Sequence, residues 1–214
     1  MLIARCYRAM PTTQMPLNLT APPLPLRLIT VEEYHRMAEV GILQPDEKVE
    51  LIAGQIISKM SPQGSPHAAA ITRTNRLFGK SLTANVLVRL QLPIILNNFS
   101  EPEPDIAVVK ADPLDYDDGH PTAEDVYLIV EIAHSTLKSD IKVKAKEYAR
   151  SGIEDYWVLD LNRRQLYVYR KPTKEGYQQE MILQENDSVK PIKFPHCLIP
   201  VAEMLRPITM NNKQ

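Results

Sequence analysis

Residues 126–160 read VYLIVEIAHSTLKSDIKVKAKEYARSGIEDYWVLD, and this stretch decides the fold class. It opens with an apolar run, residues 126–133, whose length is typical of a buried β-strand. From Ser139 the pattern predicts a helix that ends at Gly152, because glycine commonly occupies the left-handed position after a helix. A second strand, residues 155–160, follows at once. The order strand, helix, strand predicts an α/β domain.

The sequence downstream predicts an antiparallel meander. Residues 165–170 (QLYVYR) and 177–184 (YQQEMILQ) are typical strand runs. A third run lies around residues 189–195 (VKPIKFP), where Pro191 and Pro195 restrict the strand to an edge because proline donates no backbone hydrogen bond. The aromatic residues of this half are expected to pack the sheet rather than stack on bases; they are Tyr156, Trp157, Tyr167 and Tyr169.

Upstream, two more strands precede residue 126. Apolar residues alternate from Val86 to Leu92, which predicts a strand, and a second short run, DIAVV, follows Pro104. The polar and acidic stretch 111–125 then predicts a surface loop. The predicted architecture is a mixed β-sheet flanked by helices, with antiparallel additions.

The N-terminal third predicts two helices and a hairpin. Thr30 and Glu33 match a capping box that starts a short helix over residues 31–40. Residues 48–60 hold two apolar runs separated by Ala53 and Gly54, which predicts a β-hairpin ended by the Met-Ser-Pro that begins at residue 60. A second helix is expected to begin near Pro66, with its apolar face formed by Ala70, Ile71, Leu77 and Phe78.

Composition bounds the class of protein. The chain of 214 residues, 44% hydrophobic and 24% charged, suits one globular domain. Cys6 and Cys197 are isolated, which indicates free thiols in a reducing compartment. No apolar stretch is long enough to span a membrane, so we expect a cytoplasmic protein. We expect residues 1–26 to form a flexible proline-rich leader, residues 27–206 the folded domain and residues 207–214 a tail.

Charge is distributed unevenly along the chain. A net charge of -1 argues against a protein that coats nucleic acid through an overall positive field. Residues 100–134, however, carry ten acidic side chains and one basic one, Lys110, whereas basic residues outnumber acidic ones from 138 to 174. A negative segment suits a cation and a positive segment suits phosphates, and a metal-dependent nuclease needs both.

Two carboxylates stand where a lone charge is costly. Asp105 follows a proline at the entry of one strand, and Glu131 interrupts the apolar strand 126–133. A charge drawn into such a strand costs several kcal/mol unless it is paired or bound to a cation. If the strands are neighbours, the two carboxylates and the carbonyl of Ile132 form an all-oxygen site that selects magnesium or manganese.

These residues resemble the PD-(D/E)xK nuclease superfamily, through Pro104-Asp105 and, after a loop, Glu131-Ile132-Ala133. Ala133 stands where the motif has its lysine. The longer pattern, from SEPEPDIAVVK to the stretch quoted above, resembles the Uma-two family, whose members are assigned as restriction endonucleases by similarity. The resemblance covers about residues 28–205. In that family the lysine belongs to the helix ending in YARSG, which maps it to Lys144.

The resemblance implies a restriction-endonuclease-like core that hydrolyses DNA with Mg²⁺ or Mn²⁺. It implies Asp105 and Glu131 as metal ligands and Lys144 as the residue that positions or activates water. Glu50 and His67 follow as further catalytic candidates, and Gln91 as a residue that contacts nucleic acid. A homodimer is compatible with cleavage of two strands.

Each of these residues also has a plain structural interpretation. Asp105 could cap a turn, Glu131 could pair with a buried Lys or Arg, and the lysines around Lys144 could form a solvated helix face. His67 could be a metal ligand, a base, a phosphate contact or an ordinary exposed histidine. Two carboxylates also occur in glycosidases, but sugar hydrolysis needs neither the lysine nor a basic segment. A catalytically inactive nuclease-fold module that binds nucleic acid or protein remains the alternative.

Overall fold

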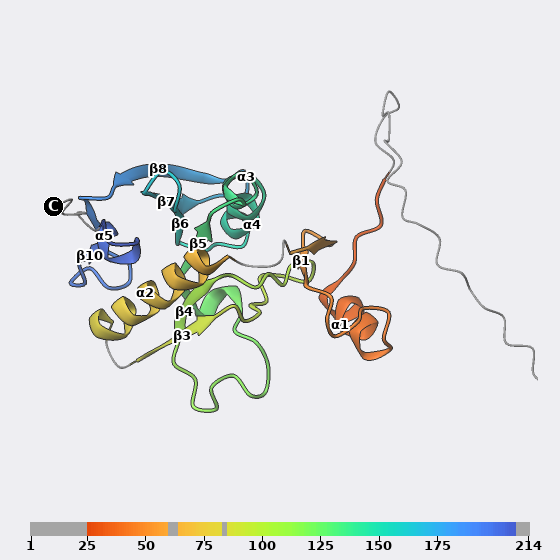
Figure 1. The fold of residues 1–214 in the computed structure, drawn as a ribbon. Helices are drawn as coiled ribbons and strands as arrows, with labels where there is room; N and C mark the ends of the chain where they lie inside the picture. The colour runs from red at the N-terminus through yellow and green to blue at the C-terminus, as the bar shows by residue number, and fades with distance from the viewer. Residues whose placement is uncertain (1–24, 60–63, 83–84, 209–214) are drawn as a thin grey trace, which may run out of the picture.

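The computed structural model describes residues 25–59, 64–82 and 85–208 (Figure 1). The helices are α1 (Val31–Glu39), α2 (Ser65–Ser81), the 3₁₀ turn η1 (Ala123–Asp125), α3 (Leu137–Ser139), the π-helical η2 (Asp140–Lys144), α4 (Ala145–Arg150) and α5 (Val201–Met204). The strands are β1 (Val49–Ile52), β2 (Gln55–Ser58), β3 (Val86–Leu90), β4 (Ile106–Lys110), β5 (Val126–Ala133), β6 (Asp155–Asp160), β7 (Gln165–Pro172), β8 (Tyr177–Gln184), β9 (Ser188–Val189) and β10 (Ile199–Pro200).

A six-stranded sheet forms the centre of the molecule, in the order β3-β4-β5-β6-β7-β8. Strands β5 and β6 are parallel, and every other neighbouring pair in this sheet is antiparallel. The parallel pair requires the crossover that the helical segment between β5 and β6 supplies. The predicted α/β class with a mixed sheet and antiparallel additions is confirmed.

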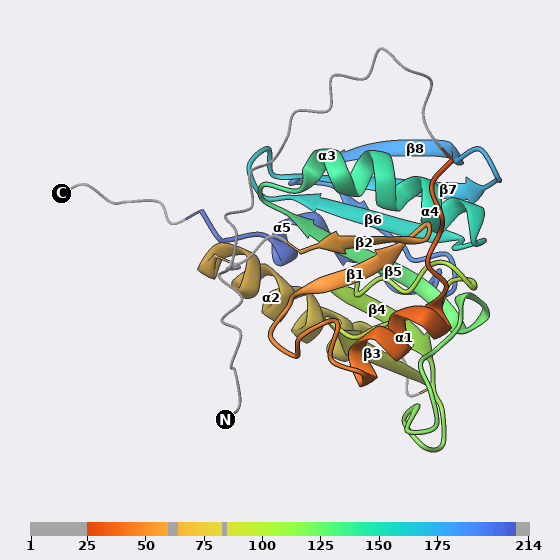
Figure 2. The same ribbon diagram turned by 90° about the vertical axis from the view of Figure 1, so that its right-hand side faces the viewer.

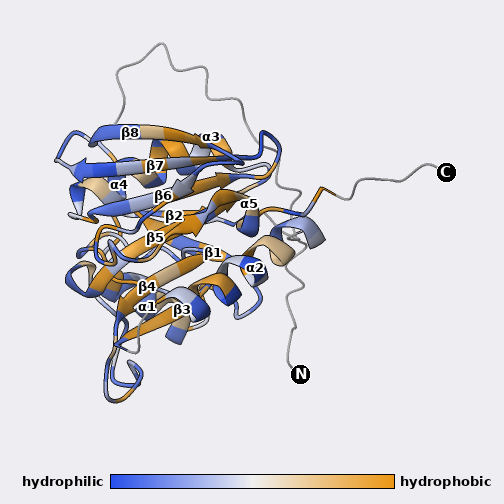
Figure 3. Cartoon of the chain, turned by 90° about the vertical axis from the view of Figure 1, so that its left-hand side faces the viewer, coloured by the Kyte–Doolittle hydropathy of each residue, from blue (hydrophilic) through white to orange (hydrophobic). Residues whose placement is uncertain are grey.

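Helices cover both faces of this sheet (Figure 2). On one face α2 and α5 pack over alternate residues of the central strands, such as Val130 and Trp157. On the other face the segment η2–α4 packs over their neighbours, such as Ile129 and Tyr156. The central strands β4 and β5 are apolar along most of their length (Figure 3). Burial on both faces explains why these strands read as continuous apolar runs.

Local predictions in the N-terminal third are confirmed. Thr30 and Glu33 form the reciprocal capping box of α1. The β1–β2 turn places Ala53 at φ 50° and Gly54 at φ 74°, the pair of positive values that a tight hairpin requires. A Cβ at position 54 would lie 2.5 Å from the Cβ of Leu28, so glycine is also needed for close packing. The Met-Ser-Pro expected to end the hairpin lies outside the described residues.

The second helix and the core aromatics also agree with prediction. Helix α2 carries a proline in its first turn, and its four predicted apolar residues are all buried. The four aromatic residues expected to pack the sheet are buried as well. Cys197 is buried and free, and Cys6 lies outside the described residues. Within the residues that the structure describes, no helix has the length and apolar content that crossing a membrane requires.

Two strand predictions are wrong in part. The strand predicted up to Leu92 ends at Leu90, because Gln91 adopts φ 52° and leaves the extended conformation. The run around residues 189–195 does not extend the meander: only Ser188–Val189 is a strand, and it pairs with Ile199–Pro200 in a separate two-stranded sheet. Pro191 cannot donate a ladder hydrogen bond, so the chain turns away after two residues.

The predicted helix of residues 139–152 is more complex than its sequence suggests. A helical path runs from Leu137 to Arg150, but residues 140–144 form a π-helix, closed by a bond from the Ala145 amide to the Asp140 carbonyl. Gly152 lies just beyond the helix with φ 83°, as predicted. A π-helical turn is rare and often marks a functional site.

Candidate active site

Asp105 and Glu131 come from neighbouring strands and meet on one face of the sheet. Ile106 of β4 pairs with Val130 of β5, so the residue before Ile106 lies opposite the residue after Val130. Side chains alternate between faces along a strand, and both carboxylates therefore lie on the face that carries η2 and α4. Asp105 is 8% exposed and Glu131 4% exposed, and the Asp105 amide donates to Glu131 Oε2 over 3.4 Å.

The Asp105 carboxylate is held by three donors. Its Oδ2 accepts from the Ile132 amide at 2.8 Å and from His67 Nε2 at 2.9 Å, and its Oδ1 accepts from Gln91 Nε2 at 3.2 Å. Burial by itself would raise the pKa of Asp105, but the hydrogen bond and charge of His67, the Ile132 amide and the charge of Lys144 lower it. Asp105 is therefore ionised at neutral pH.

His67 and Gln91 bond different oxygens of Asp105. His67 lies in the first turn of α2, and its Nδ1 is buried with no hydrogen-bond partner among the described residues. The other ring nitrogen, Nε2, bonds Asp105, so His67 helps to hold this carboxylate in position. Gln91 leaves β3 in the left-handed conformation, a strained state for a residue with a side chain and one that is often found at functional sites.

The Glu131 carboxylate is held mainly through one oxygen. Its Oε1 accepts from Lys144 Nζ at 3.0 Å and from the Tyr148 hydroxyl at 3.0 Å. Within the described part of the chain, Oε2 accepts only the long bond from the Asp105 amide. Lys144 and Tyr148 are four residues apart on one helical face, as the sequence indicates. Lys144, the lysine that the family resemblance indicates, therefore reaches Glu131 of the carboxylate pair.

Lys144 joins a third carboxylate to the site. Its Nζ lies 3.1 Å from Glu50 Oε1, and Glu50 Oε2 accepts from the Glu103 amide at 3.1 Å. Lys144 lines a small hollow together with residues of three segments; they are Ile52, Leu96, Pro102, Glu147 and Tyr148. The carboxylates of Glu50 and Glu131 hold the ammonium group between β1 and β5.

Acidic groups outnumber basic ones in this buried region. Burial raises the pKa of Glu131 to about 8; Lys144 opposes the rise, while the charges of Asp105, Asp140 and Glu50 add to it. Burial likewise raises the pKa of Asp140, which is 3% exposed. For Lys144, burial would lower the pKa, but the charges of Glu131, Glu50 and Asp140 raise it above the ordinary value, so the ammonium stays protonated.

The structure brings together all the site residues proposed from sequence: Glu50, His67, Gln91, Asp105, Glu131 and Lys144. Sequence reasoning missed Asp140 and Tyr148. The spacing of four residues between Asp140 and Lys144 on one predicted helix is the signal that could have identified Asp140. The only sequence signal for Tyr148 is its spacing of four residues from Lys144. A tyrosine that merely packs in the core would show the same spacing.

The acidic segment of residues 100–134 is not a single patch. Asp105 stands at the start of β4, whereas the loop 111–125 leaves the opposite end of that strand, and it extends away from the sheet (Figure 2). Asp112 in this loop accepts from the amides of Leu114 and Tyr116, and Asp125 caps η1. Asp112 and Asp125 therefore stabilise turns at the end of β4 that lies away from Asp105.

The carboxylate oxygens suit a hard divalent cation. On Asp105 and on Glu131 one oxygen is saturated by two short hydrogen bonds, and the other has a single bond of 3.2 or 3.4 Å. These two weakly held oxygens, in a buried region with surplus negative charge, fit a magnesium ion that takes two carboxylates and completes its shell with water and phosphate. No group of three or more His, Cys, Asp or Glu side chains in the described part of the chain is arranged to hold a metal ion by itself.

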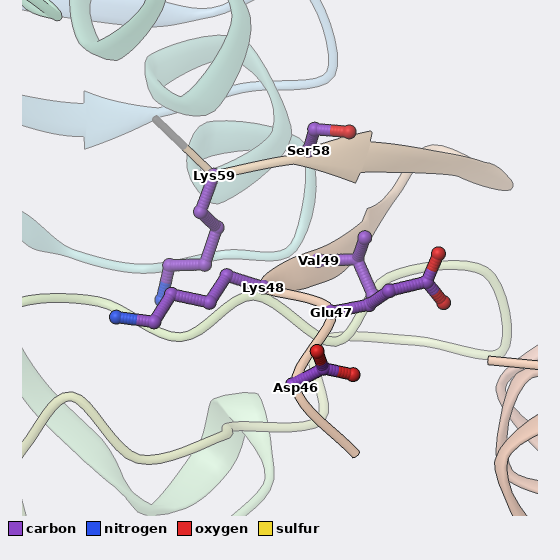
Figure 4. Close-up of a pocket in the computed structure, with 6 residues that line it drawn as sticks. All are labelled: Asp46, Glu47, Lys48, Val49, Ser58 and Lys59. Carbon is purple, nitrogen blue, oxygen red and sulfur yellow. The ribbon is translucent and has the colours of Figure 1, made fainter. Parts of the chain in front are cut away.

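A separate shallow pocket lies beside the β1–β2 hairpin. Its volume is about 380 Å³, and its lining is Asp46, Glu47, Lys48, Val49, Ser58 and Lys59 (Figure 4). Lys59 pairs with Glu103 at 2.7 Å, and the Glu103 amide in turn contacts Glu50. The pocket has a lining of mixed charge and contains none of the facing carboxylates, so it is not the candidate active site.

Comparisons with known proteins agree with this geometry. A solved structure described as "a putative nuclease belonging to DUF820", from Anabaena variabilis ATCC 29413, superposes with a TM-score of 0.62 at 19% identity, covering 82% of this chain and 97% of the other. This likeness shows the shared fold. The comparison with curated proteins found no match. The model of the Uma2 family, described as "Putative restriction endonuclease", matches residues 31–201, and the chain therefore belongs to the Uma2 family.

Proposed function

We propose that the protein is a divalent-metal-dependent endonuclease that hydrolyses phosphodiester bonds in DNA. The observation that carries the proposal is the meeting of Asp105 and Glu131 on one sheet face, with Lys144 Nζ 3.0 Å from Glu131. The family description, "Putative restriction endonuclease", supports DNA as the substrate. Because cutting both strands takes two such sites, the proposal includes a homodimer.

Asp105 and Glu131 would hold the cation, Mg²⁺ or Mn²⁺, through their weakly bonded oxygens, with the carbonyl of Ile132 as a further ligand. When bound, the cation polarises the phosphate and lowers the pKa of a coordinated water. The protein groups around the cation hold and orient its ligands. Asp105 is fixed for this role by His67 and the Ile132 amide, both of which bond its other oxygen.

Lys144 acts as a positive charge and hydrogen-bond donor. Its raised pKa keeps it protonated at neutral pH, so it does not remove a proton from water. A protonated ammonium can orient the attacking water and offset the negative charge that builds on phosphate oxygens in the transition state. Glu50 and Glu131 both lie within 3.1 Å of Nζ and hold it in place.

Gln91 follows β3, which borders β4 on the edge away from β5. Among the residues that the structure describes, its amide is the only side-chain donor to Asp105 Oδ1. A substrate or cation that takes over this oxygen would release the Gln91 amide, which could then bond a phosphate or a base. We therefore keep Gln91 as the proposed contact to nucleic acid.

The test is the Asp105→Ala variant in a plasmid-nicking assay with magnesium. We expect nicking to fall at least about a thousandfold, because a metal ligand is lost, while circular dichroism shows an intact fold. Asp112→Ala, in the exposed acidic loop, is the matched control and should nick at the normal rate. Metal-dependent nicking by the Asp105 variant at the wild-type rate would eliminate the proposal.

A second candidate is a nuclease-fold module that binds nucleic acid or protein without cutting. The observation that favours it is the saturation of Glu131 Oε1 by Lys144 and Tyr148, which also suits a structural ion pair. Calorimetric titration with magnesium, run beside the nicking assay, separates the two. Magnesium binding with nicking supports the nuclease, and nucleic-acid binding without nicking supports the module.

A further inference from the structure

The helical segment Leu137–Arg150 has two sides of different charge. Asp140, Lys144 and Glu147 are buried against the sheet and the site. The outer side carries four basic residues, all exposed and each four positions from the next: Lys138, Lys142, Lys146 and Arg150. Residues four apart lie close to one line along a helix, so these four form a single row, here called the basic stripe.

No carboxylate in the described residues lies within ion-pair distance of the basic stripe. Surface ion pairs do occur elsewhere, where Arg36 pairs with Glu39 and Arg164 with Glu185. The stripe has no such partner because its own segment supplies no acid to the outer side.

The two acids of the segment are both engaged on the inner side. Glu147 accepts from the Ser100 hydroxyl at 2.5 Å and from Asn97 at 2.9 Å. Asp140 is buried beside Lys144 and accepts from Thr136. The outer side is therefore purely cationic, although the net charge of the chain is -1. A purely cationic row on a nearly neutral protein is complementary to a regular polyanion.

We propose that the basic stripe binds the sugar–phosphate backbone of double-stranded DNA. Its placement relative to the cutting site rests on the proposed function. Twelve residues of α-helix rise about 18 Å, and the π-helical turn of residues 140–144 shortens the segment somewhat. A duplex strand carries one phosphate per about 3.4 Å of axis, so the stripe spans several phosphates. Lys144 occupies the inner side of the same segment, so the stripe lies about one helix diameter, roughly 10 Å, from the site.

In this arrangement the segment has two tasks. Its inner side supplies Lys144 to the reaction, and its outer side holds the flanking duplex. The segment covers the same face of the sheet as the β1–β2 hairpin that carries Glu50 (Figure 2), and its four stripe residues are exposed. Phosphate contacts of this kind position a duplex without reading its sequence.

The test replaces all four stripe residues with glutamine (K138Q, K142Q, K146Q and R150Q) and measures binding to a labelled duplex in EDTA over a range of salt concentrations. We expect the affinity to fall at least tenfold at low salt, and the slope of log K against log salt to shrink by about 3 to 4, because each phosphate contact contributes about 0.9. The matched control is glutamine at four exposed lysines elsewhere, Lys171, Lys174, Lys190 and Lys193, which should change neither quantity.

Each outcome separates this proposal from the nuclease proposal. Equal loss of affinity in the stripe variant and the control, or no loss in either, overturns the stripe. Stripe-dependent duplex binding by a wild-type protein that never nicks DNA supports the stripe and overturns the nuclease. Stripe-dependent binding of single-stranded RNA but not of duplex DNA overturns the assigned ligand. If the fourfold variant does not fold, the K138Q/K142Q and K146Q/R150Q pairs should each remove about 2 from the slope.

Discussion

Two buried carboxylates on adjacent strands have opposite kinds of surroundings. Asp155, at the start of β6, is 0% exposed and accepts from Trp157 Nε1, from the Arg170 guanidinium and from the Ile192 amide. One carboxylate faces one guanidinium, and both of its oxygens are bonded twice. Glu131, on β5, shares a single lysine with other acids and keeps one oxygen almost free.

Under the proposed function, the difference separates a structural acid, Asp155, from a reactive one, Glu131. Arg170 cannot lose its proton, so the Asp155 pair is a fixed neutral unit that joins β6, β7 and the C-terminal segment. The site around Glu131 holds more negative charge than its own cations neutralise, and it relieves this by taking up a proton, as the raised pKa of Glu131 shows. Burial raises the pKa of Asp155 as well, but Arg170, the Ile192 amide and Trp157 oppose that rise without any added group. The surplus negative charge around Glu131 is what would favour an added cation there.

The largest predicted effect concerns Lys144, the lysine that Glu131 shares with other acids. Lys144→Met should lower nicking about a hundredfold to a thousandfold, because the transition state loses a positioned charge. Its stability should change by less than about 2 kcal/mol, since the remaining acids can take up a proton in place of the ammonium. Nicking rates and urea unfolding measure the two effects. Lys171→Met, at an exposed lysine outside the site and the basic stripe, is the control for single-site chemistry, and equal loss of nicking in both variants would contradict the assignment.

The next largest effect concerns the ion pair between Asp155 and Arg170. Asp155→Asn should lower the free energy of unfolding by about 3 kcal/mol, because it leaves the Arg170 charge without a counter-ion. Magnesium affinity, measured by calorimetry at a temperature where the variant is folded, should stay at the wild-type value. A loss of magnesium affinity comparable to that of Asp105→Ala would show that the two regions are not independent.

A third prediction concerns how stability and magnesium affinity depend on pH through Glu131. The folded chain retains a proton on Glu131 up to about pH 8, whereas the unfolded chain releases it near the ordinary value of 4.5. This group therefore lowers the stability of the metal-free protein as pH rises from 4.5 toward 8. Magnesium competes with the same proton, so its affinity should rise between about pH 6 and about pH 8.

The measurement is the melting temperature with and without magnesium at both ends of that range. The increase caused by magnesium should be larger at the higher pH in the wild type. Glu131→Gln, which has no proton to lose, should show no such trend. A magnesium effect of equal size at both pH values in the wild type would mean that Glu131 is already ionised in the metal-free protein.

The smallest predicted effect concerns Tyr148. Tyr148→Phe removes one of the two short hydrogen bonds to Glu131 Oε1 and should cost about 1 kcal/mol of stability. Nicking should fall less than about tenfold, because Lys144 still bonds the same oxygen. Urea unfolding and the nicking rate test this, and a loss of activity as large as that of Lys144→Met would assign Tyr148 a direct role.

The sequence by itself determined the local elements and the identity of the important acids. A capping box, a hairpin turn and a helix-ending glycine act over a few residues, so their structure follows from nearby sequence. Glu131 could be identified because a charge inside an apolar strand demands a partner. The family resemblance was needed for Lys144, since spacing alone did not distinguish it from Lys142 and Lys146.

Only the tertiary structure decided how these residues meet. The register of β4 against β5 places Asp105 opposite Glu131, and the π-helical turn puts Asp140 and Lys144 on the buried side together. Strand register and helix placement depend on packing between segments far apart in the chain, which no local pattern encodes. The same physics explains why the last predicted strand paired with Ile199–Pro200 instead of the meander: its partner was fixed by the folded surface around it.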